Sequence, residues 1–407
     1  VDQRTFATRW ADTSNHSWLT LIQQHIGDVI WYSFSLKPEI ARARHEVVGC
    51  DVRLLRTSAL HRGLWRMFYM PRPAWRWRRA YPVYATVASY ASLATSRLIQ
   101  ALKQDRPQAL FVQDYATGRF DTLVWLARRL RIPLVAYHTG SQPEKYTGRL
   151  AKRWTLPRAN RLIVSSGDEL EMLATRFKVP RDRLRLILTP IDTSVFTPLD
   201  RTSSCRSSEL DPSRRYLLFI GRFDDKVKRI SSLIRAFGGL TDVHKDVDLV
   251  IVGGGKDAEE LHRTAGESAP GRVIFREWTS DKEGLARLYN SAECLVLPSI
   301  KEGFPTVVGE AMACGTPVVG SKVGGIPELV TNESTGWLVS PGDIGDLTNR
   351  LAHVMSHPDA TRAMRERARQ VAMERVSPAV VVAGLRECFS DLLEEEVPEG
   401  GKREPTR

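Results

Sequence analysis

Residues 297–315, LPSIKEGFPTVVGEAMACG, contain the residue types of an anion-binding turn. The apolar start predicts the end of a strand, and the residues after the turn predict a helix over 306–314. Pro305 fits the beginning of such a helix, because the N–H group that proline lacks is not needed there. The N–H groups of Thr306 and Val307 would then be free, with the positive end of the helix dipole behind them. Such a helix start binds phosphate groups.

Two carboxylates flank this helix start. Glu302 precedes it, and Glu310 lies inside the helix, eight residues further on. Gly303 lets the backbone approach a ligand closely. Carboxylates accept hydrogen bonds from hydroxyl groups, so a sugar and a ribose are suitable partners. The alternative is a solvated loop Glu and an ordinary helix-surface Glu, which the Gly-Phe-Pro before the helix disfavours.

A basic pair follows an apolar stretch earlier in the chain. Residues 216–220 predict a strand that ends near Arg222, and residues 230–237 predict the amphipathic helix that comes next. Arg222 and Lys228, at the carboxyl end of this strand, could clamp a diphosphate. Lys226 is a rival for the place of Lys228. A basic surface loop is the alternative, and the phosphate-type helix start favours the clamp.

The elements that must position these residues alternate between strand and helix, a pattern typical of parallel α/β sheets. The expected strands are 109–112, 134–137, 161–164, 216–220, 247–252, 272–275 and 294–297. We therefore predict an α/β protein with two Rossmann-like, doubly wound domains that face a cleft, each with its ligand loops at the carboxyl ends of the strands.

A polar, Ser-rich stretch at residues 197–214 is interpreted as the linker between the domains. The N-terminal domain would then span residues 1–196, and the C-terminal domain residues 215–377. Residues 396–407 lack periodicity and are expected to be disordered.

Residues 216–345 resemble the C-terminal domain of the retaining family-four (group 1) glycosyltransferases, which have the two-Rossmann GT-B fold. The motifs that carry the resemblance are Gly221-Arg222 with Lys228, Gly253-Gly254-Gly255, Leu297-Pro298-Ser299, Glu302-x7-Glu310, GTPVV at 315–319, Gly324-Gly325-Ile326-Pro327-Glu328 and Gly336-Trp337-Leu338-Val339. The N-terminal half matches more loosely, over residues 134–140, 163–166 and 191–198. It departs from the family where residues 11–16 lack the usual Gly-Gly loop and where Thr189-Pro190 replaces Asn-Gly.

The resemblance implies a role for each matching position. The first domain would bind the acceptor and the second the donor, and a helix over about 378–395 would cross back to the first. Positive groups and backbone N–H groups would hold the donor diphosphate: Gly221, Arg222, Lys228, Thr306 and Val307. The donor sugar would contact Glu302, Gly303, Phe304 and Pro305. The ribose and base would contact Glu310, Arg276 and Trp278. His138, from the first domain, would lie over the anomeric carbon.

The chemistry of the reaction agrees with these roles. Cleavage of a glycosyl–phosphate bond places negative charge on the departing diphosphate, which fixed positive groups stabilise. No metal and no cofactor besides the nucleotide-diphosphate sugar is then required, and the pair Asp224-Asp225 is interpreted as part of a loop. Same-face attack and double displacement both stay open as routes to retention. No second carboxylate stands out as a nucleophile, so Glu302 is interpreted as a sugar ligand.

The formal net charge of the chain is +12, and it is unevenly distributed. Residues 1–200 contain 31 Lys and Arg against 16 Asp and Glu, and residues 61–84 contain six Arg, several aromatic residues and no acid. This segment suits an anionic membrane surface or a lipid-linked acceptor. A soluble anionic acceptor and a solvated loop with packed aromatics are the alternatives, and nucleic acid is not expected.

Two rival functions remain open: a non-catalytic binding subunit with the same fold, and a basic protein that docks on membrane or nucleic acid. The intact sets of Glu302 with Glu310 and Arg222 with Lys228 disfavour the first rival. Five cysteines without CxxC spacing and the lack of a signal-peptide pattern predict a cytoplasmic protein, peripheral to the inner face of the membrane if the basic segment docks there.

Overall fold

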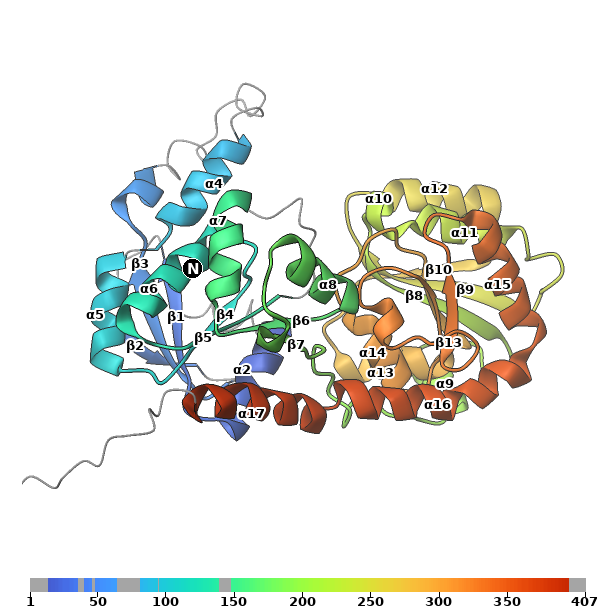
Figure 1. Ribbon diagram of the computed structural model, residues 1–407. Coiled ribbons are helices and arrows are strands. Elements are labelled where there is room, and N and C mark those ends of the chain that lie inside the picture. Colours follow the sequence, from blue (N-terminus) through green and yellow to red (C-terminus); the bar gives the residue numbers. More distant parts are fainter. Residues whose placement is uncertain are drawn as a thin grey trace, which may run out of the picture. The chain divides into compact units, whose positions relative to one another are not determined.

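The computed structural model describes residues 14–35, 40–45, 48–63, 81–93, 95–138 and 148–394 of the 407-residue chain. The chain divides into two compact units (Figure 1). Unit 1 comprises residues 1–164, 168–187 and 382–407, and unit 2 comprises residues 165–167 and 188–381. Each contains a parallel sheet with helices. The predicted α/β fold with two Rossmann-like domains is confirmed.

The described strands of unit 1 form two sheets. The first has the order β1-β3-β2, in which β1 and β3 are parallel and β2 is antiparallel, and the second is the parallel sheet β4-β5-β6-β7. The strands are β1 (Ile30–Ser35), β2 (Ile40–Arg44), β3 (Asp51–Arg56), β4 (Leu110–Gln113), β5 (Leu134–Tyr137), β6 (Arg161–Val164) and β7 (Leu184–Leu186). The helices are α2 (Ser14–His25), α4 (Tyr81–Ala91), α5 (Thr95–Asp105), α6 (Gly118–Leu130), α7 (Arg149–Thr155) and α8 (Gly167–Arg176).

Burial explains the strands of the four-stranded sheet. Every residue of β5 and β6 is buried, as expected of a parallel sheet covered on both faces. The amphipathic helix α6 buries Phe120 and Val124 against this sheet. Residues 382–394 of the final helix α17 (Pro378–Glu394) also belong to unit 1. There Phe389 lies 6.3 Å from Phe111 between ring centres.

Unit 2 has one six-stranded sheet with the order β10-β9-β8-β11-β12-β13, in which all neighbours are parallel. Its strands are β8 (Arg215–Arg222), β9 (Val247–Gly254), β10 (Val273–Arg276), β11 (Cys294–Leu297), β12 (Val318–Ser321) and β13 (Gly336–Val339). Its helices are α9 (Arg201–Ser207), α10 (Asp225–Lys228), α11 (Ile230–Gly238), α12 (Ala258–Ser268), α13 (Lys282–Ser291), α14 (Thr306–Ala313), α15 (Ile344–Ser356) and α16 (Pro358–Val376). The strand order reverses between β8 and β11, and ligands of doubly wound sheets bind beyond the carboxyl ends of the strands at such a point.

The linker predicted at residues 197–214 is wrong, because this stretch contains helix α9 and packs within unit 2. Asp200 caps the helix by accepting a hydrogen bond from the Ser203 N–H at 2.7 Å. Cys205 and Leu210 are buried in the core of unit 2. The serines that suggested a linker therefore belong to a capped helix whose few apolar side chains face inward.

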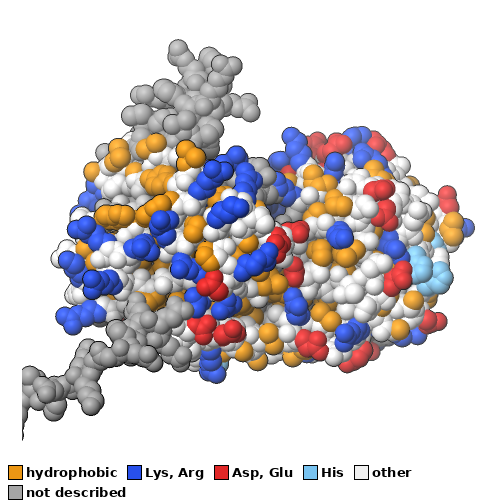
Figure 2. Space-filling view, in the orientation of Figure 1, with side chains coloured by type: hydrophobic (Ala, Val, Ile, Leu, Met, Phe, Trp, Pro, Cys, Tyr) orange, Lys and Arg blue, Asp and Glu red, His pale blue; other side chains and the backbone are white. Residues whose placement is uncertain are grey.

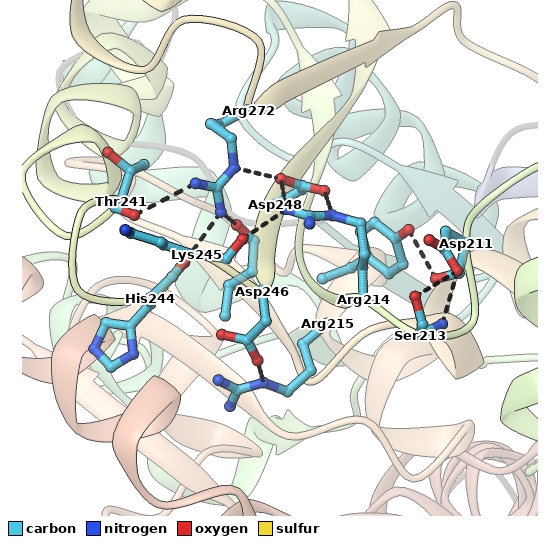
Figure 3. Close-up of polar contacts among 12 residues, drawn as sticks. Asp211, Ser213, Arg214, Arg215, Thr241, His244, Lys245, Asp246, Asp248 and Arg272 are labelled. Carbon is cyan, nitrogen blue, oxygen red and sulfur yellow. Dashed lines mark hydrogen bonds and ion pairs between the residues drawn. The ribbon is translucent and has the colours of Figure 1, made fainter.

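A buried carboxylate and two arginines connect the amino ends of β8, β9 and β10. Asp248, the second residue of β9, is 6% exposed and accepts hydrogen bonds from Arg214 and Arg272 (Figure 3). Arg214 Nη2 lies 2.6 Å and Arg272 Nε 2.7 Å from Oδ1 of Asp248. Arg272 also donates to the carbonyl of His244. This network lies at the edge of the sheet opposite the carboxyl ends of the strands.

Charge is distributed differently on the two units. In Figure 2, Lys and Arg predominate among the charged side chains on the visible face of unit 1, whereas acidic side chains are frequent among the basic ones on unit 2. Residues 64–80, the centre of the basic aromatic segment predicted at 61–84, lie outside the described residues, as do residues 396–407. Within the part of the chain that the structure describes, no helix combines the length and the apolar character needed to cross a membrane.

Candidate functional site

The candidate site lies in unit 2 where the neighbouring strands β8 and β11 end. Strand β8 leads through Arg222 into helix α10, and β11 leads through Ser299 into the loop before α14. The two connections are joined directly, because the Ile300 N–H donates to the carbonyl of Val227 at 2.9 Å. The geometry therefore brings together two motifs about 75 residues apart, at the position where a doubly wound sheet binds its ligand.

Lys228 and Glu302 form an ion pair at this junction. Lys228 Nζ lies 2.6 Å from Oε1 of Glu302, and the buried Ser299 hydroxyl donates to the same oxygen at 2.6 Å. The side chain of Glu302 is only 8% exposed and that of Lys228 19%. Lys226, the rival lysine, is exposed on α10. Lys228 is thus the lysine that reaches the loop, and Ser299 is a supporting residue that sequence analysis noted only as part of a motif.

A pair of glycines holds the loop at 302–304 in place. Gly324 has a φ of +53°, and a side chain there would collide with the backbone carbonyls of Glu302 and Gly303. The Gly325 N–H donates to the Gly303 carbonyl at 2.6 Å. Phe304 is 6% exposed and packs beside Gly325. The Gly-Gly-Ile-Pro-Glu motif therefore positions the loop backbone, a function that its sequence alone did not reveal.

Helix α14 begins at Thr306 with Pro305 at its N-cap and no side chain bonded to that cap. The Val308 N–H donates to the Pro305 carbonyl at 3.1 Å. Thr306 and Val307 are half-buried. The start of α14 thus presents the positive end of a helix dipole beside Glu302, as the sequence predicted.

Glu310 occupies the next turn of α14 and bonds to a residue that sequence analysis missed. The hydroxyl of Tyr289, on α13, donates to Oε2 of Glu310 at 2.8 Å. Tyr289 is completely buried, so burial and then the carboxylate of Glu310 raise the pKa of its hydroxyl well above the ordinary value. The tyrosine is thus a neutral donor that fixes the carboxylate. In the sequence it is indistinguishable from other core positions of an amphipathic helix.

The remaining donor-site candidates have different surroundings. Arg222, after Gly221 at the end of β8, is exposed. Arg276, at the end of the edge strand β10, donates to the carbonyl of Ser208 at 2.5 Å, after helix α9. Trp278 is 57% exposed. The guanidinium of Arg276 thus anchors the end of α9, whereas the Trp278 side chain is exposed to solvent.

The acidic pair beside Arg222 has structural partners. Asp225 accepts hydrogen bonds from the N–H and the hydroxyl of Ser231, at 2.8 and 2.6 Å, and so caps helix α11. Asp224 lies 3.4 Å from Nζ of Lys256. Across the described residues, no group of three His, Cys, Asp or Glu side chains is arranged to hold a metal ion.

In unit 1, His138 follows the last residue of β5, and Asp114 follows the last residue of the neighbouring strand β4. Nδ1 of His138 lies 3.2 Å from Oδ1 of Asp114. Burial alone would raise the pKa of Asp114, but the hydrogen bond and charge of His138, with smaller contributions from the Ala116 N–H and Lys152, lower it overall. Asp114 is a candidate that sequence analysis missed, although an acid directly after a predicted strand was the available signal.

Two family descriptions match consecutive parts of the chain. Residues 200–371 match the glycosyl transferases group 1. Residues 28–195 match glycosyltransferase family 4.

Curated relatives of this chain are also named as glycosyltransferases. A protein of Mycobacterium sp. (strain KMS), named D-inositol 3-phosphate glycosyltransferase, is 34% identical in an alignment of 257 positions that covers 58% of this chain and 57% of the relative. A protein of the same name from Pseudarthrobacter chlorophenolicus is 30% identical over 56% of this chain and 55% of its own length. The matched part of the chain thus spans little more than half the length of these relatives.

Solved structures with this fold cover nearly the whole chain. Sucrose-phosphate synthase from Thermosynechococcus elongatus has a TM-score of 0.69 at 21% identity, and covers 97% of this chain and 95% of its own. The Anabaena protein HepE, in complex with UDP, has a TM-score of 0.71 at 15% identity, over 94% and 97% of the two chains. These solved structures show the fold. The two family descriptions together match most of the sequence and show that the chain belongs to the group 1 glycosyltransferases.

Proposed function

We propose that this chain transfers a sugar from a nucleotide-diphosphate sugar to an acceptor. The observation that carries the proposal is the convergence of Lys228, Glu302 and the start of α14 at the switch point of the unit 2 sheet. This place offers positive charge for a diphosphate and a carboxylate for hydroxyl groups within one loop junction. The HepE structures, which contain UDP or UDP-glucose, support a donor of this class.

The proposed catalysis is electrostatic. As the glycosyl–phosphate bond breaks, the departing diphosphate gains negative charge, which Lys228, Arg222 and the N–H groups at the start of α14 are suited to stabilise. These protein groups then balance the negative charge of the diphosphate, so the proposed reaction requires no metal. Stereochemical retention, which the family resemblance implies, is part of the proposal, and NMR of the product anomer would test it.

Glu302 is proposed to hold the donor sugar. Lys228 and Ser299 both bond to Oε1, so this oxygen fixes the carboxylate in place. We assign the other oxygen, Oε2, to a hydroxyl group of the sugar. Lys228 would then contact both the carboxylate that holds the sugar and the diphosphate. The ion pair therefore links the binding of the sugar to the binding of the diphosphate.

The acceptor is proposed to bind unit 1, whose excess of basic residues favours an anionic partner. A lipid-linked acceptor on an anionic membrane surface is the partner that the basic aromatic segment at 61–84 favours. Because the curated relatives are named D-inositol 3-phosphate glycosyltransferases, an inositol phosphate is the first soluble acceptor to include in a screen.

A donor screen tests the proposal. The full chain is incubated with UDP-, GDP-, ADP- and dTDP-sugars, with and without acceptor, and released nucleoside diphosphate is measured. We expect release from one donor class, increased by an acceptor. Binding of a donor without any release would favour a non-catalytic subunit, and neither binding nor release would overturn the proposal.

Replacement of Glu310 by Ala should weaken nucleotide binding. A hydrogen bond from a hydroxyl to a carboxylate contributes about 1.5–3 kcal/mol, so we expect the Kd of the nucleoside diphosphate to rise about 10- to 100-fold. Isothermal titration calorimetry measures this. Tyr289→Phe is the control, because it removes the partner hydroxyl and keeps the carboxylate. Because the carboxylate remains, this variant should raise the Kd by less than Glu310→Ala does, whereas an equal loss in both variants would mean that the Tyr289–Glu310 hydrogen bond matters and a direct contact of Glu310 with the nucleotide does not.

Replacement of Asp114 by Asn should lower kcat/KM about tenfold through His138. The Asn side chain keeps an acceptor for the Ala116 N–H and tolerates the φ of +68° at this position, so the variant removes mainly the charge beside the imidazole. A double-mutant cycle checks the mechanism. In a His138→Ala background, Asp114→Asn should change kcat/KM by less than twofold. Equal effects in both backgrounds would show that Asp114 does not act through His138.

A further inference from the structure

Unit 1 contains a hollow of about 600 Å³ that the proposed transfer reaction does not use. It lies among the end of helix α6, the end of helix α7 and the turns that precede strands β5 and β6. Its lining residues are Val124, Trp125, Ala127, Arg128, Arg129, Arg131, Ile132, Pro133, Leu134, Trp154, Arg158, Asn160 and Arg183. Five arginines and no acid thus surround one concavity.

The charge of these five arginines is not balanced within the described part of the chain, where none of them forms an ion pair. Some arginines elsewhere in unit 1 do have carboxylate partners. Arg181 lies 2.6 Å from Glu171, and Arg185 lies 3.4 Å from Asp391. Like charges that are gathered without counter-charges repel one another, and an anion from solution relieves that repulsion. The hollow thus gathers five arginines without a carboxylate partner among the described residues, an arrangement that favours a bound anion.

Two tryptophans hold part of this charge in position. The guanidinium carbon of Arg158 lies 4.4 Å from the ring centre of Trp154, and that of Arg129 lies 5.6 Å from Trp125. Arg158 also donates to the carbonyl of Trp154 at 2.9 Å. A guanidinium that lies over a ring keeps its remaining N–H groups available for an oxyanion. The rings therefore preorganise the arginines.

The hollow is distinct from the end of the sheet that carries His138. It meets β5 at Leu134, the first residue of the strand, whereas His138 follows the last residue. At about 3.3 Å per residue, four steps along the strand separate the two positions by about 13 Å. Val124, Ala127 and Leu134 are buried and form an apolar floor beneath the arginines.

We propose that this hollow binds a ligand that carries two or more phosphate groups. Arginine pairs with phosphate oxygens through two parallel N–H donors, and five arginines around one concavity suit more than one such group. Phosphate groups of this kind belong either to soluble compounds or to lipid headgroups. The inference is independent of the proposed transfer reaction.

Binding of inorganic tripolyphosphate to the full chain tests the proposal. The variant pair Arg128→Gln with Arg158→Gln removes two charges from the hollow. The control pair Arg153→Gln with Arg176→Gln removes two charges from exposed positions of unit 1 outside it. We expect the first pair to weaken calorimetric binding at least tenfold and the control pair less than twofold, with equal thermal midpoints. Because tripolyphosphate also suits the site in unit 2, hydrogen exchange should localise the protection to residues 124–134 and 154–160.

Vesicles of phosphatidylcholine with 5% of a phosphorylated phosphoinositide distinguish the source of the phosphates. A loss of vesicle binding in the first pair alone, with weak tripolyphosphate binding, would identify the ligand as a lipid headgroup. A loss of tripolyphosphate binding alone would identify a soluble ligand. Equal losses in both variant pairs, or no protection of the hollow by either probe, would overturn the proposal.

Discussion

Replacement of Lys228 by Ala should lower kcat by about 10²–10³-fold, the usual loss when one preorganised charge-stabilising donor is removed from a transition state. Lys228 is held at 2.6 Å from Glu302 at the carboxyl end of β8, with its side chain 19% exposed. A positive charge fixed in this way needs little reorganisation when a diphosphate departs. The same change also leaves Glu302 without its cation, so the KM for the donor should rise. Steady-state kinetics with the donor identified by the screen measures both values.

Lys226→Ala is the matched control for this prediction. It removes the same charge from the same short helix, but Lys226 is exposed and lies two residues away. We expect its kcat to stay within twofold of the unaltered chain. A similar loss of kcat in both variants would mean that only the general charge of α10 matters, and an unchanged kcat in Lys228→Ala would remove Lys228 from the proposed machinery.

Replacement of Asp248 by Asn should destabilise unit 2 by about 3 kcal/mol. Asp248 is 6% exposed and accepts hydrogen bonds from both Arg214 and Arg272 (Figure 3). Removal of one partner from a buried ion pair costs about 3–5 kcal/mol, because the remaining charge stays buried without compensation. The low end of that range applies since the two arginines are partly exposed, at 31% and 19% of their side chains.

Hydrogen exchange of the amides in β8 and β9 measures this effect, and their protection should fall about 100-fold. Asp246→Asn is the control, because Asp246 pairs with Arg215 at 2.6 Å but its side chain is 54% exposed. Exposed pairs contribute about 0–1 kcal/mol, so the control should change protection less than tenfold. Equal effects of the two substitutions would show that the buried network does not stabilise the amino ends of the strands.

The sequence predicts elements well where the pattern is local. Strand β11 and helix α11 begin at the expected residues, because apolar runs and periodic apolar faces specify them directly. Helix α14 also begins as expected, with Pro305 at its N-cap. Helix α9 was missed because its signals are weak. It is seven residues long, and its serines are equally typical of a linker and of a capped helix.

The sequence likewise predicts some residues of the candidate site and not others. Residues 302–310 come from one motif, so their types and spacing alone indicate a phosphate and hydroxyl site. Their partners come from distant segments: Lys228 is 74 residues from Glu302, and Tyr289 is 21 residues from Glu310. Such pairs depend on which strands become neighbours, and only the strand order brings them together. The same reason explains why Asp114 was missed, since it meets His138 through the pairing of β4 with β5.

We infer that the start of α14 and the loop before it bind the diphosphate of a nucleotide. Hydrogen exchange of the full chain with and without UDP, GDP, ADP and dTDP measures this directly, because an N–H that donates to phosphate exchanges more slowly. One of the four nucleotides should slow exchange at Thr306 and Val307 and in the loop at 302–304, with no such change in Lys228→Ala at the same nucleotide concentration. Binding of a nucleotide without protection of these amides, or protection confined to another part of the chain, would contradict the claim.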